Sequence, residues 1–266
     1  MSDGARTIYE DFDPEAPETT EFRRMLTRIA RGGQGANLGT LLVTSAERGE
    51  GKTTSASLLA LVAALHRGLR TCLVDADLHR PRIAKLFEIP GAPGLAEILG
   101  DGLPISSALH PSRHEALKII PAGRRRPFPS ELLVPSRLGA VFTELKRTFH
   151  FIVVDAPPLL PVSDPAVLSR EVDGVALVVR AGRTQRDVAQ RAKKILSDAG
   201  ANVLGAIVNN ADDVLPYYYG HTYYRYGERA AEEAAPADAP PDARVSRHGK
   251  GSKAKPPERS TTGSPG

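Results

Sequence analysis

The segment TSAERGEGKTTS, residues 44–55, limits the fold of this chain more than any other stretch. It follows LGTLLVTS (38–45), an apolar run typical of a strand, and leads into TTSASLLALVAALHRG (53–68), which is typical of a helix. Gly49 and Gly51 let backbone N–H groups turn inward, and the helix N-terminus adds positive potential. This strand–loop–helix order predicts a phosphate-binding loop.

The loop supplies the first candidate site residues. Lys52 is expected to reach the β- and γ-phosphates of a nucleotide, and the Thr53 hydroxyl to bind Mg²⁺. The strict pattern requires glycine at position 46, where this chain has Ala46, so the prediction depends on the strand–loop–helix context. The candidate cofactor-binding residues of the loop are Gly49, Glu50, Gly51, Lys52, Thr53 and Thr54.

Further apolar runs alternate with helical stretches as far as residue 215. They are RTCLVDAD, ALKIIPAG, FHFIVVDAPP, GVALVVRAG and ANVLGAIVNN. Because these runs are apolar nearly throughout, both faces of each strand are expected to be covered. The alternation predicts an α/β fold of the P-loop NTPase type, a parallel sheet with helices on both faces. Ligands of such sheets bind beyond the carboxyl ends of the strands.

Carboxylates stand at two of these strand ends. Asp75 and Asp77 follow the second run, which a parallel sheet could place beside the first, and on an extended strand they point the same way. Asp155 ends the run FHFIVVD before two prolines, as a second magnesium carboxylate would. We assign Asp77 and Asp155 to Mg²⁺, and Asp75 to a proton-accepting or water-mediated metal role. The alternatives are an ordinary turn and a loop-capping aspartate.

The nucleotide is expected to be ATP with Mg²⁺. No G-x-G-x-x-G follows a strand, which argues against a dinucleotide, and the last strand ends in VNNADD without a guanine-reading motif. Asn209 is then a candidate adenine contact, with a structural loop asparagine as the alternative.

Tyrosines gather directly after the last strand. Of 7 tyrosines, Tyr9 stands alone and the others lie in YYYGHTYYRYG (217–227), namely Tyr217, Tyr218, Tyr219, Tyr223, Tyr224 and Tyr226. Such a run can be an enzyme's own substrate, or it can stack on sugars or dock a partner.

The ends of the chain differ in composition from its centre. Residues 1–20 are expected to form a flexible acidic leader, 21–215 the folded domain with a helix at about 21–31, and 228–266 a disordered tail. The basic end of that tail could touch nucleic acid or an anionic membrane, but a solvated tail with no specific nucleic-acid partner is preferred. The lone Cys72, the lack of a long apolar run and the lack of a secretory signal favour the cytoplasm.

Residues 38–227 resemble the bacterial tyrosine kinases, P-loop autokinases of capsule and exopolysaccharide systems. Beyond the site motifs, the resemblance lies in the tyrosine cluster and in GLAEIL (94–99), PAG (121–123), PSELL (129–133), PVSDPAVL (161–168) and VDGVALVVRAGRT (172–184). It implies ATP-dependent autophosphorylation of the six clustered tyrosines, with Lys52, Asp75 and Asp77 as catalytic residues. It also implies a role in regulating polysaccharide synthesis or export.

The resemblance further implies partners. The form without its own span works with a transmembrane activator of the polysaccharide co-polymerase type, at the inner face of the cell membrane, and a protein-tyrosine phosphatase reverses the modification. Family members assemble into rings through Glu-x-x-Arg-x-x-Arg; here Glu21 and Arg24 match, but Thr27 replaces the second arginine. Arg48 and His79 also depart from the family's usual residues.

Two alternative functions remain possible interpretations of the sequence. Partitioning and septum-positioning ATPases carry a lysine five residues before the loop lysine, where this chain has Glu47. An ATP-gated scaffold would use the aromatic cluster for binding. ATP hydrolysis without phosphotyrosine would favour either of these over a kinase.

Overall fold

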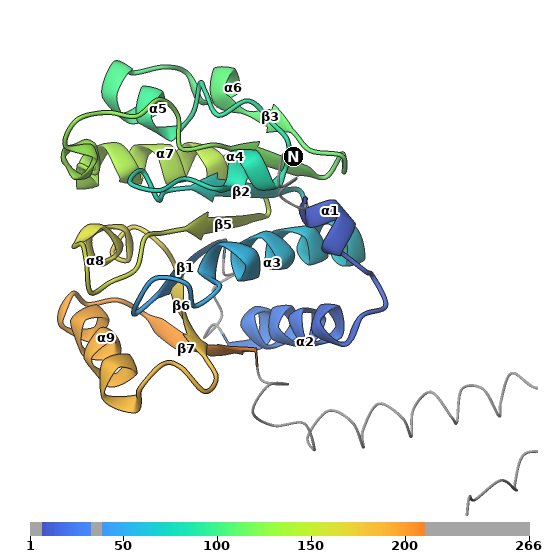
Figure 1. Ribbon diagram of the computed structural model, residues 1–266. Helices are drawn as coiled ribbons and strands as arrows, with labels where there is room; N and C mark the ends of the chain where they lie inside the picture. The colour runs from blue at the N-terminus through green and yellow to red at the C-terminus, as the bar shows by residue number, and fades with distance from the viewer. Residues whose placement is uncertain (1–6, 33–38, 211–266) are drawn as a thin grey trace, which may run out of the picture. The chain divides into compact units, whose positions relative to one another are not determined.

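A single seven-stranded sheet forms the centre of the protein (Figure 1). The computed structural model describes residues 7–32 and 39–210, so the tyrosine cluster and the tail lie outside the described residues. The strands are β1 (Thr40–Ser45), β2 (Thr71–Asp75), β3 (His110–Pro111), β4 (Leu117–Ile120), β5 (Phe151–Asp155), β6 (Gly174–Arg180) and β7 (Val203–Asn209).

The sheet runs in the order β3-β4-β2-β5-β1-β6-β7 and is parallel except for the short β3, which pairs antiparallel with β4. Every apolar run predicted to be a strand is one. The expectation that β2 lies beside β1 was wrong, because β5 is inserted between them and pairs with both. This insertion brings the carboxylates at the ends of β2 and β5 next to each other.

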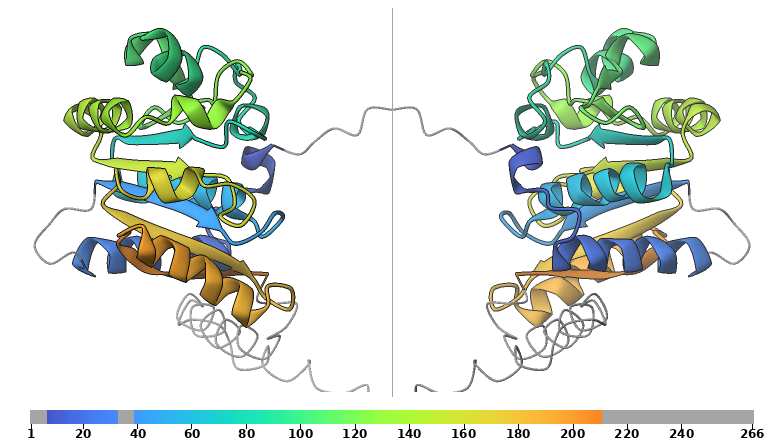
Figure 2. Two further views of the ribbon diagram at one scale, coloured as in Figure 1. Left: turned by 90° about the vertical axis from the view of Figure 1, so that its left-hand side faces the viewer. Right: turned by 90° about the vertical axis from the view of Figure 1, so that its right-hand side faces the viewer.

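Helices cover both faces of the sheet, as predicted (Figure 2). One face carries α1 (Ile8–Asp11), α2 (Pro17–Gly32), α3 (Lys52–Arg67) and α4 (Ile83–Leu86). The other carries α5 (Leu95–Asp101), α6 (Ile105–Ala108), the 3₁₀ turn η1 (Pro129–Leu132), α7 (Pro135–Thr148), α8 (Asp164–Leu168) and α9 (Arg186–Asp198). The helix α3 is buried around most of its circumference because it lies between the sheet and α2.

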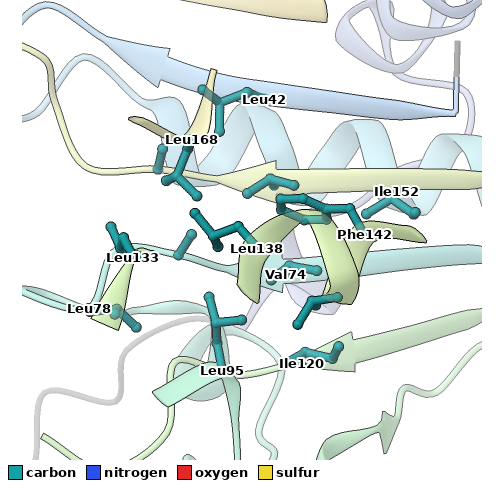
Figure 3. Packing of buried hydrophobic residues seen from close by; sticks show 14 of the residues in the cluster. Leu42, Val74, Leu78, Leu95, Ile120, Leu133, Leu138, Phe142, Ile152 and Leu168 are labelled. Atoms are coloured by element: carbon teal, nitrogen blue, oxygen red, sulfur yellow. The ribbon is translucent and has the colours of Figure 1, made fainter. Parts of the chain in front are cut away.

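The strands β1, β2, β4, β5 and β6 are largely buried because their side chains alternate between two cores. The edge strand β7 is mostly exposed, so the expectation that both faces of every strand are covered was wrong for the run ANVLGAIVNN. Leu42 of β1 faces the α7 side and packs in the cluster shown in Figure 3, where Phe142 of α7 also lies. Its neighbours Leu41 and Val43 face α3 on the opposite side. Burying one such side chain contributes about 1.5–3 kcal/mol, so both layers hold the strand ends in place.

Residues 7–20 of the predicted acidic leader are more ordered than their composition predicted. The expected leader extends to residue 20, but α2 begins at Pro17, and α1 buries Ile8 to 2% exposure. Tyr9 packs edge-on against Phe87 with ring centroids 5.6 Å apart, and its hydroxyl oxygen accepts a hydrogen bond from the Arg113 N–H. Apolar contacts therefore hold residues 7–20 in a folded conformation despite their acidic composition.

Within residues 7–32 and 39–210, none of the helices combines the length and hydropathy that crossing a bilayer requires.

Candidate active site

The loop between β1 and α3 has the backbone conformation that its glycines predicted. Gly49 and Gly51 have φ angles of +79° and +94°, in the left-handed region that side chains disfavour. Gly51 caps α3 and leaves the first N–H groups of this 16-residue helix without a side-chain cap. The N-terminus of α3 therefore opens toward the cavity described below, as an anion site does.

The phosphate-binding loop is braced from the β6 and β7 side. The Glu50 carboxylate is buried at 2% exposure, where it accepts the Glu47 N–H at 2.7 Å and the Thr184 hydroxyl. Thr184 in turn accepts the Arg180 N–H at 2.8 Å. The sequence placed Glu50 in the cofactor site but gave no sign of Thr184, which lies 134 residues further along the chain.

Asn209, the predicted adenine contact, lies at this brace. Its Nδ2 donates to the Glu50 carbonyl at 3.0 Å, and its Oδ1 accepts the Asn210 N–H. A Cβ added to Gly51 would lie 2.0 Å from Asn209 Nδ2, so a side chain at position 51 would displace this amide from its place beside the loop. The last strand is thereby tied to the phosphate-binding loop.

Asp75 and Asp155 are paired across the strands β2 and β5. Asp75 is fully buried, and its carboxylate accepts backbone N–H groups of Asp77, Arg82 and Ile83 at 3.1–3.2 Å. Burial, followed by the nearby charge of Asp155, raises the pKa of Asp75 to about 8. A carboxylate offers about four acceptor positions, so these three donors leave one for a further proton donor.

Lys52 links the loop to these carboxylates. Its Nζ donates to Asp77 Oδ2 at 2.9 Å and lies 3.8 Å from Asp155 Oδ1. Burial alone would lower the pKa of Lys52, but the charges of Asp155 and Asp77 outweigh it, and the pKa is raised. The lysine is therefore a permanent cation held beneath the loop.

The residues assigned to Mg²⁺ fit that ion. Asp155 Oδ1 is buried and has no hydrogen-bond partner among the described residues, so this oxygen can accept a cation. Burial raises the pKa of Asp155 to about 6, although Lys52 and Thr53 lower it. No cluster of three His, Cys, Asp or Glu side chains in the described part could hold a metal alone. That suits Mg²⁺, which relies on one or two carboxylates plus water and phosphate.

A cavity of about 750 Å³ opens above these groups. Its size suits a small-molecule ligand. Of the predicted site residues, Gly49, Gly51, Lys52, Thr53, Thr54 and Asp77 line it, whereas Glu50, Asp75, Asp155 and Asn209 do not. The other lining residues are Arg48, His79, Arg80, Pro81, Arg82, Lys85, Leu86, Pro157, Pro158, Pro161 and Val162.

A second polar cluster holds the loop after Asp77. His79 Nε2 lies 3.0 Å from Asp164 Oδ2, and the Ser130 hydroxyl donates to Asp164 Oδ1 at 2.7 Å. Asp164 is 1% exposed and begins α8, while Ser130 lies in η1. The sequence contained both residues within PVSDPAVL and PSELL, but nothing marked them as neighbours of His79.

Known proteins are similar to this chain in sequence and in fold. Tyrosine-protein kinase CpsD of Streptococcus agalactiae is 30% identical over 217 residues, which cover 81% of this chain and 93% of that protein. The kinase domain of Escherichia coli tyrosine kinase ETK has a TM-score of 0.73 at 28% identity and covers 79% of this chain and 82% of its own. The chain belongs to the bacterial tyrosine-kinase family.

The kinase also shares its P-loop NTPase fold with more distant proteins. Septum site-determining protein MinD from Pyrococcus horikoshii, complexed with Mg-ADP, has a TM-score of 0.56 at 22% identity, covering 77% of this chain and 75% of its own. No protein-family model matches the kinase. The tyrosine-kinase relatives are thus both more similar in sequence and closer in fold than MinD.

Proposed function

We propose that this kinase transfers the γ-phosphoryl group of ATP to tyrosine hydroxyls. Its main acceptors are those of its own cluster, Tyr217, Tyr218, Tyr219, Tyr223, Tyr224 and Tyr226. The observation that carries the proposal is the position of Lys52, between Asp77 and Asp155 and on the wall of a cavity that the phosphate-binding loop shares. Membership of the tyrosine-kinase family supports phosphoryl transfer over simple hydrolysis.

Each residue has a defined task in this proposal. The loop N–H groups and Lys52 hold the phosphates, while Thr53, Asp77 and Asp155 would hold Mg²⁺. When bound, Mg²⁺ would neutralise the charge that develops on the transferred phosphoryl group. The tyrosine oxygen forms a bond to the γ-phosphorus, the bond to the β–γ bridging oxygen breaks, and ADP leaves with that electron pair. Because Asp75 is buried and does not line the cavity, the phenol proton would reach its carboxylate through water.

The proposed setting follows from the resemblance to the family. We place the kinase in the regulation of capsule or exopolysaccharide synthesis or export, on the cytoplasmic face of the membrane. A transmembrane activator of the co-polymerase type would recruit it, and a phosphatase would reset it. Glu21 pairs with Arg24 within α2 at 2.6 Å, and Thr27 accepts a hydrogen bond from Arg67 of α3. Thr27 therefore serves α2–α3 packing where the ring motif has an arginine.

The direct test is incubation of the full chain with labelled ATP and Mg²⁺, followed by mass spectrometry of the cluster peptides. Phosphotyrosine is expected in wild type and should fall at least about 100-fold in Lys52→Met, because the phosphates lose their main cation. Lys194→Met is the matched control, since among the described residues Lys194 forms its ion pair with Asp198, also on α9 and away from the cavity. ATP turnover without phosphotyrosine would instead favour the alternative functions, an ATPase or an ATP-gated scaffold.

A further inference from the structure

Four exposed cations stand on the wall of the active-site cavity: Arg48, Arg80, Arg82 and Lys85. Many other charged side chains of the described residues form ion pairs, for example Arg113 with Glu88 and Lys146 with Asp173. Within residues 7–32 and 39–210, the side chains of these four have no ion pair and no hydrogen bond. Their charge is therefore available to whatever enters the cavity.

The nucleotide accounts for only part of this charge. A triphosphate with bound Mg²⁺ carries about two net negative charges. Lys52 and Arg48, both from the phosphate-binding loop and its helix, are the cations nearest in sequence to the phosphate cradle. Arg82 and Lys85 belong to a different element, the turn into α4 and α4 itself. Arg82 and Lys85 thus add positive charge to the cavity beyond that supplied by the phosphate-binding loop.

Part of the cavity wall is apolar. Pro157, Pro158, Pro161 and Val162 follow β5 and line it. Apolar proline side chains suit the ring of a phenol, whose hydroxyl can then face the phosphates. An acceptor peptide entering here would have its tyrosine ring on the proline wall and its neighbouring residues within reach of Arg82 and Lys85.

We propose that Arg82 and Lys85 select acceptor tyrosines that are preceded by acidic residues. This inference rests on the proposed kinase function and names its acceptor class. In this chain the matching acids are Asp212 and Asp213, of which Asp213 stands four residues before Tyr217 in the sequence NADDVLPYYYG (210–220). Four extended residues span at most about 14 Å. A peptide of that reach can cross a cavity of this size while its tyrosine stays at the phosphates.

The test compares two peptides as substrates of the full-length kinase, NADDVLPYYYG and its Asn-substituted form NANNVLPYYYG. Wild type is expected to phosphorylate the acidic peptide with a kcat/KM about five-fold higher, the size of effect that two exposed charge pairs produce. The difference should shrink in high salt. Arg82→Gln/Lys85→Gln should lose this preference, whereas the matched control Arg191→Gln/Lys193→Gln on α9 should keep it. Equal use of both peptides by wild type overturns the inference.

A binding measurement separates this inference from the kinase proposal. Fluorescence anisotropy with labelled NADDVLPFFFG, which has no phosphoryl acceptor, should show tighter binding to wild type than to Arg82→Gln/Lys85→Gln. If the peptide binds in this way but no phosphotyrosine ever forms, the kinase proposal fails while the recognition of acidic segments stands. If phosphotyrosine forms but the two proteins bind the peptide equally, the recognition fails and the kinase proposal stands.

Discussion

The side chain of Asn209, the last residue of β7, donates from Nδ2 to the backbone carbonyl of Glu50 at 3.0 Å. Glu50 precedes Gly51 in the phosphate-binding loop, 159 residues away in the sequence. The strand that leads into the tyrosine cluster is therefore joined to the loop that would hold the phosphates. This contact makes Asn209 a positioning residue for the loop, whether or not it also touches adenine.

Replacing Asn209 separates these two roles. Asn209→Ala should cost about 1 kcal/mol of stability for the lost hydrogen bond. If the amide acts by bracing the loop, the variant should bind Mg-ATP and Mg-tripolyphosphate more weakly by the same factor. An adenine contact would weaken ATP binding alone. Both affinities can be measured by calorimetry.

A control for this substitution lies at the other end of the same strand region. Asn202 Nδ2 donates to the Asp173 carbonyl at 2.8 Å, before the start of β7. Asn202→Ala removes the same kind of hydrogen bond far from the loop and should leave both affinities unchanged. If Asn202→Ala and Asn209→Ala lost nucleotide affinity equally, general destabilisation would explain the result, and Asn209 would have no specific role in positioning the loop.

The sequence predicted well what depends on local pattern. The strands follow from apolar runs, and the loop follows from Gly49, Gly51 and Lys52, because backbone conformation and residue type are directly linked there. It could not predict that β5 lies between β1 and β2, since strand order depends on how the connections cross the sheet. Consequently the pairing of Asp75 with Asp155 emerged only from the structure.

The polar contacts around the site were also beyond sequence reasoning. Asp164 and Thr184 carry no local signature, because their partners are 85 and 134 residues away. For the acidic N-terminal segment, the sequence led to a wrong prediction in residues 7–20. Its charge predicted disorder, whereas a few apolar side chains such as Ile8 were enough to hold it against the domain.

The pair formed by His79 and Asp164 should contribute to stability. His79→Leu removes one of two partners of a carboxylate that is 1% exposed, and it should lower the free energy of unfolding by about 2 kcal/mol. His79→Arg restores a donor to Asp164 and should recover most of this loss. Urea denaturation measures both. Identical midpoints for the leucine and arginine variants would contradict a bonding role for His79.

Gly94 should tolerate no side chain. A Cβ at this position would lie 2.1 Å from the Pro121 carbonyl oxygen and 2.5 Å from the Gly123 nitrogen, both backbone atoms that cannot move independently. Gly94→Ala is expected to destabilise the protein by about 3 kcal/mol, which thermal unfolding would detect. Gly205→Ala on β7 is the control, because among the described residues no atom beyond its chain neighbours lies within 4 Å of the added Cβ, and its change should stay within about 0.5 kcal/mol.

The protein without nucleotide or divalent cation should become more stable as the pH falls from 8 to 7. Burial and the charge of Asp155 raise the pKa of Asp75 to about 8, above the value of about 3.9 expected in the unfolded chain. The folded state therefore binds more protons than the unfolded state in this range, so the free energy of unfolding decreases as the pH rises. The slope should be on the order of 1 kcal/mol per pH unit.

Thermal unfolding in EDTA at several pH values between 7 and 8 measures this slope, and Asp75→Asn is its control. His66 and His114, whose pKa values burial lowers, act in the opposite direction, and their contribution fades as the pH rises from 7 to 8. Although Asp75→Asn weakens the hydrogen bonds to Arg82 and Ile83, its unfolding temperature should depend less on pH than that of wild type. A wild-type unfolding temperature that rises with pH would show that Asp75 is already ionised in the folded protein.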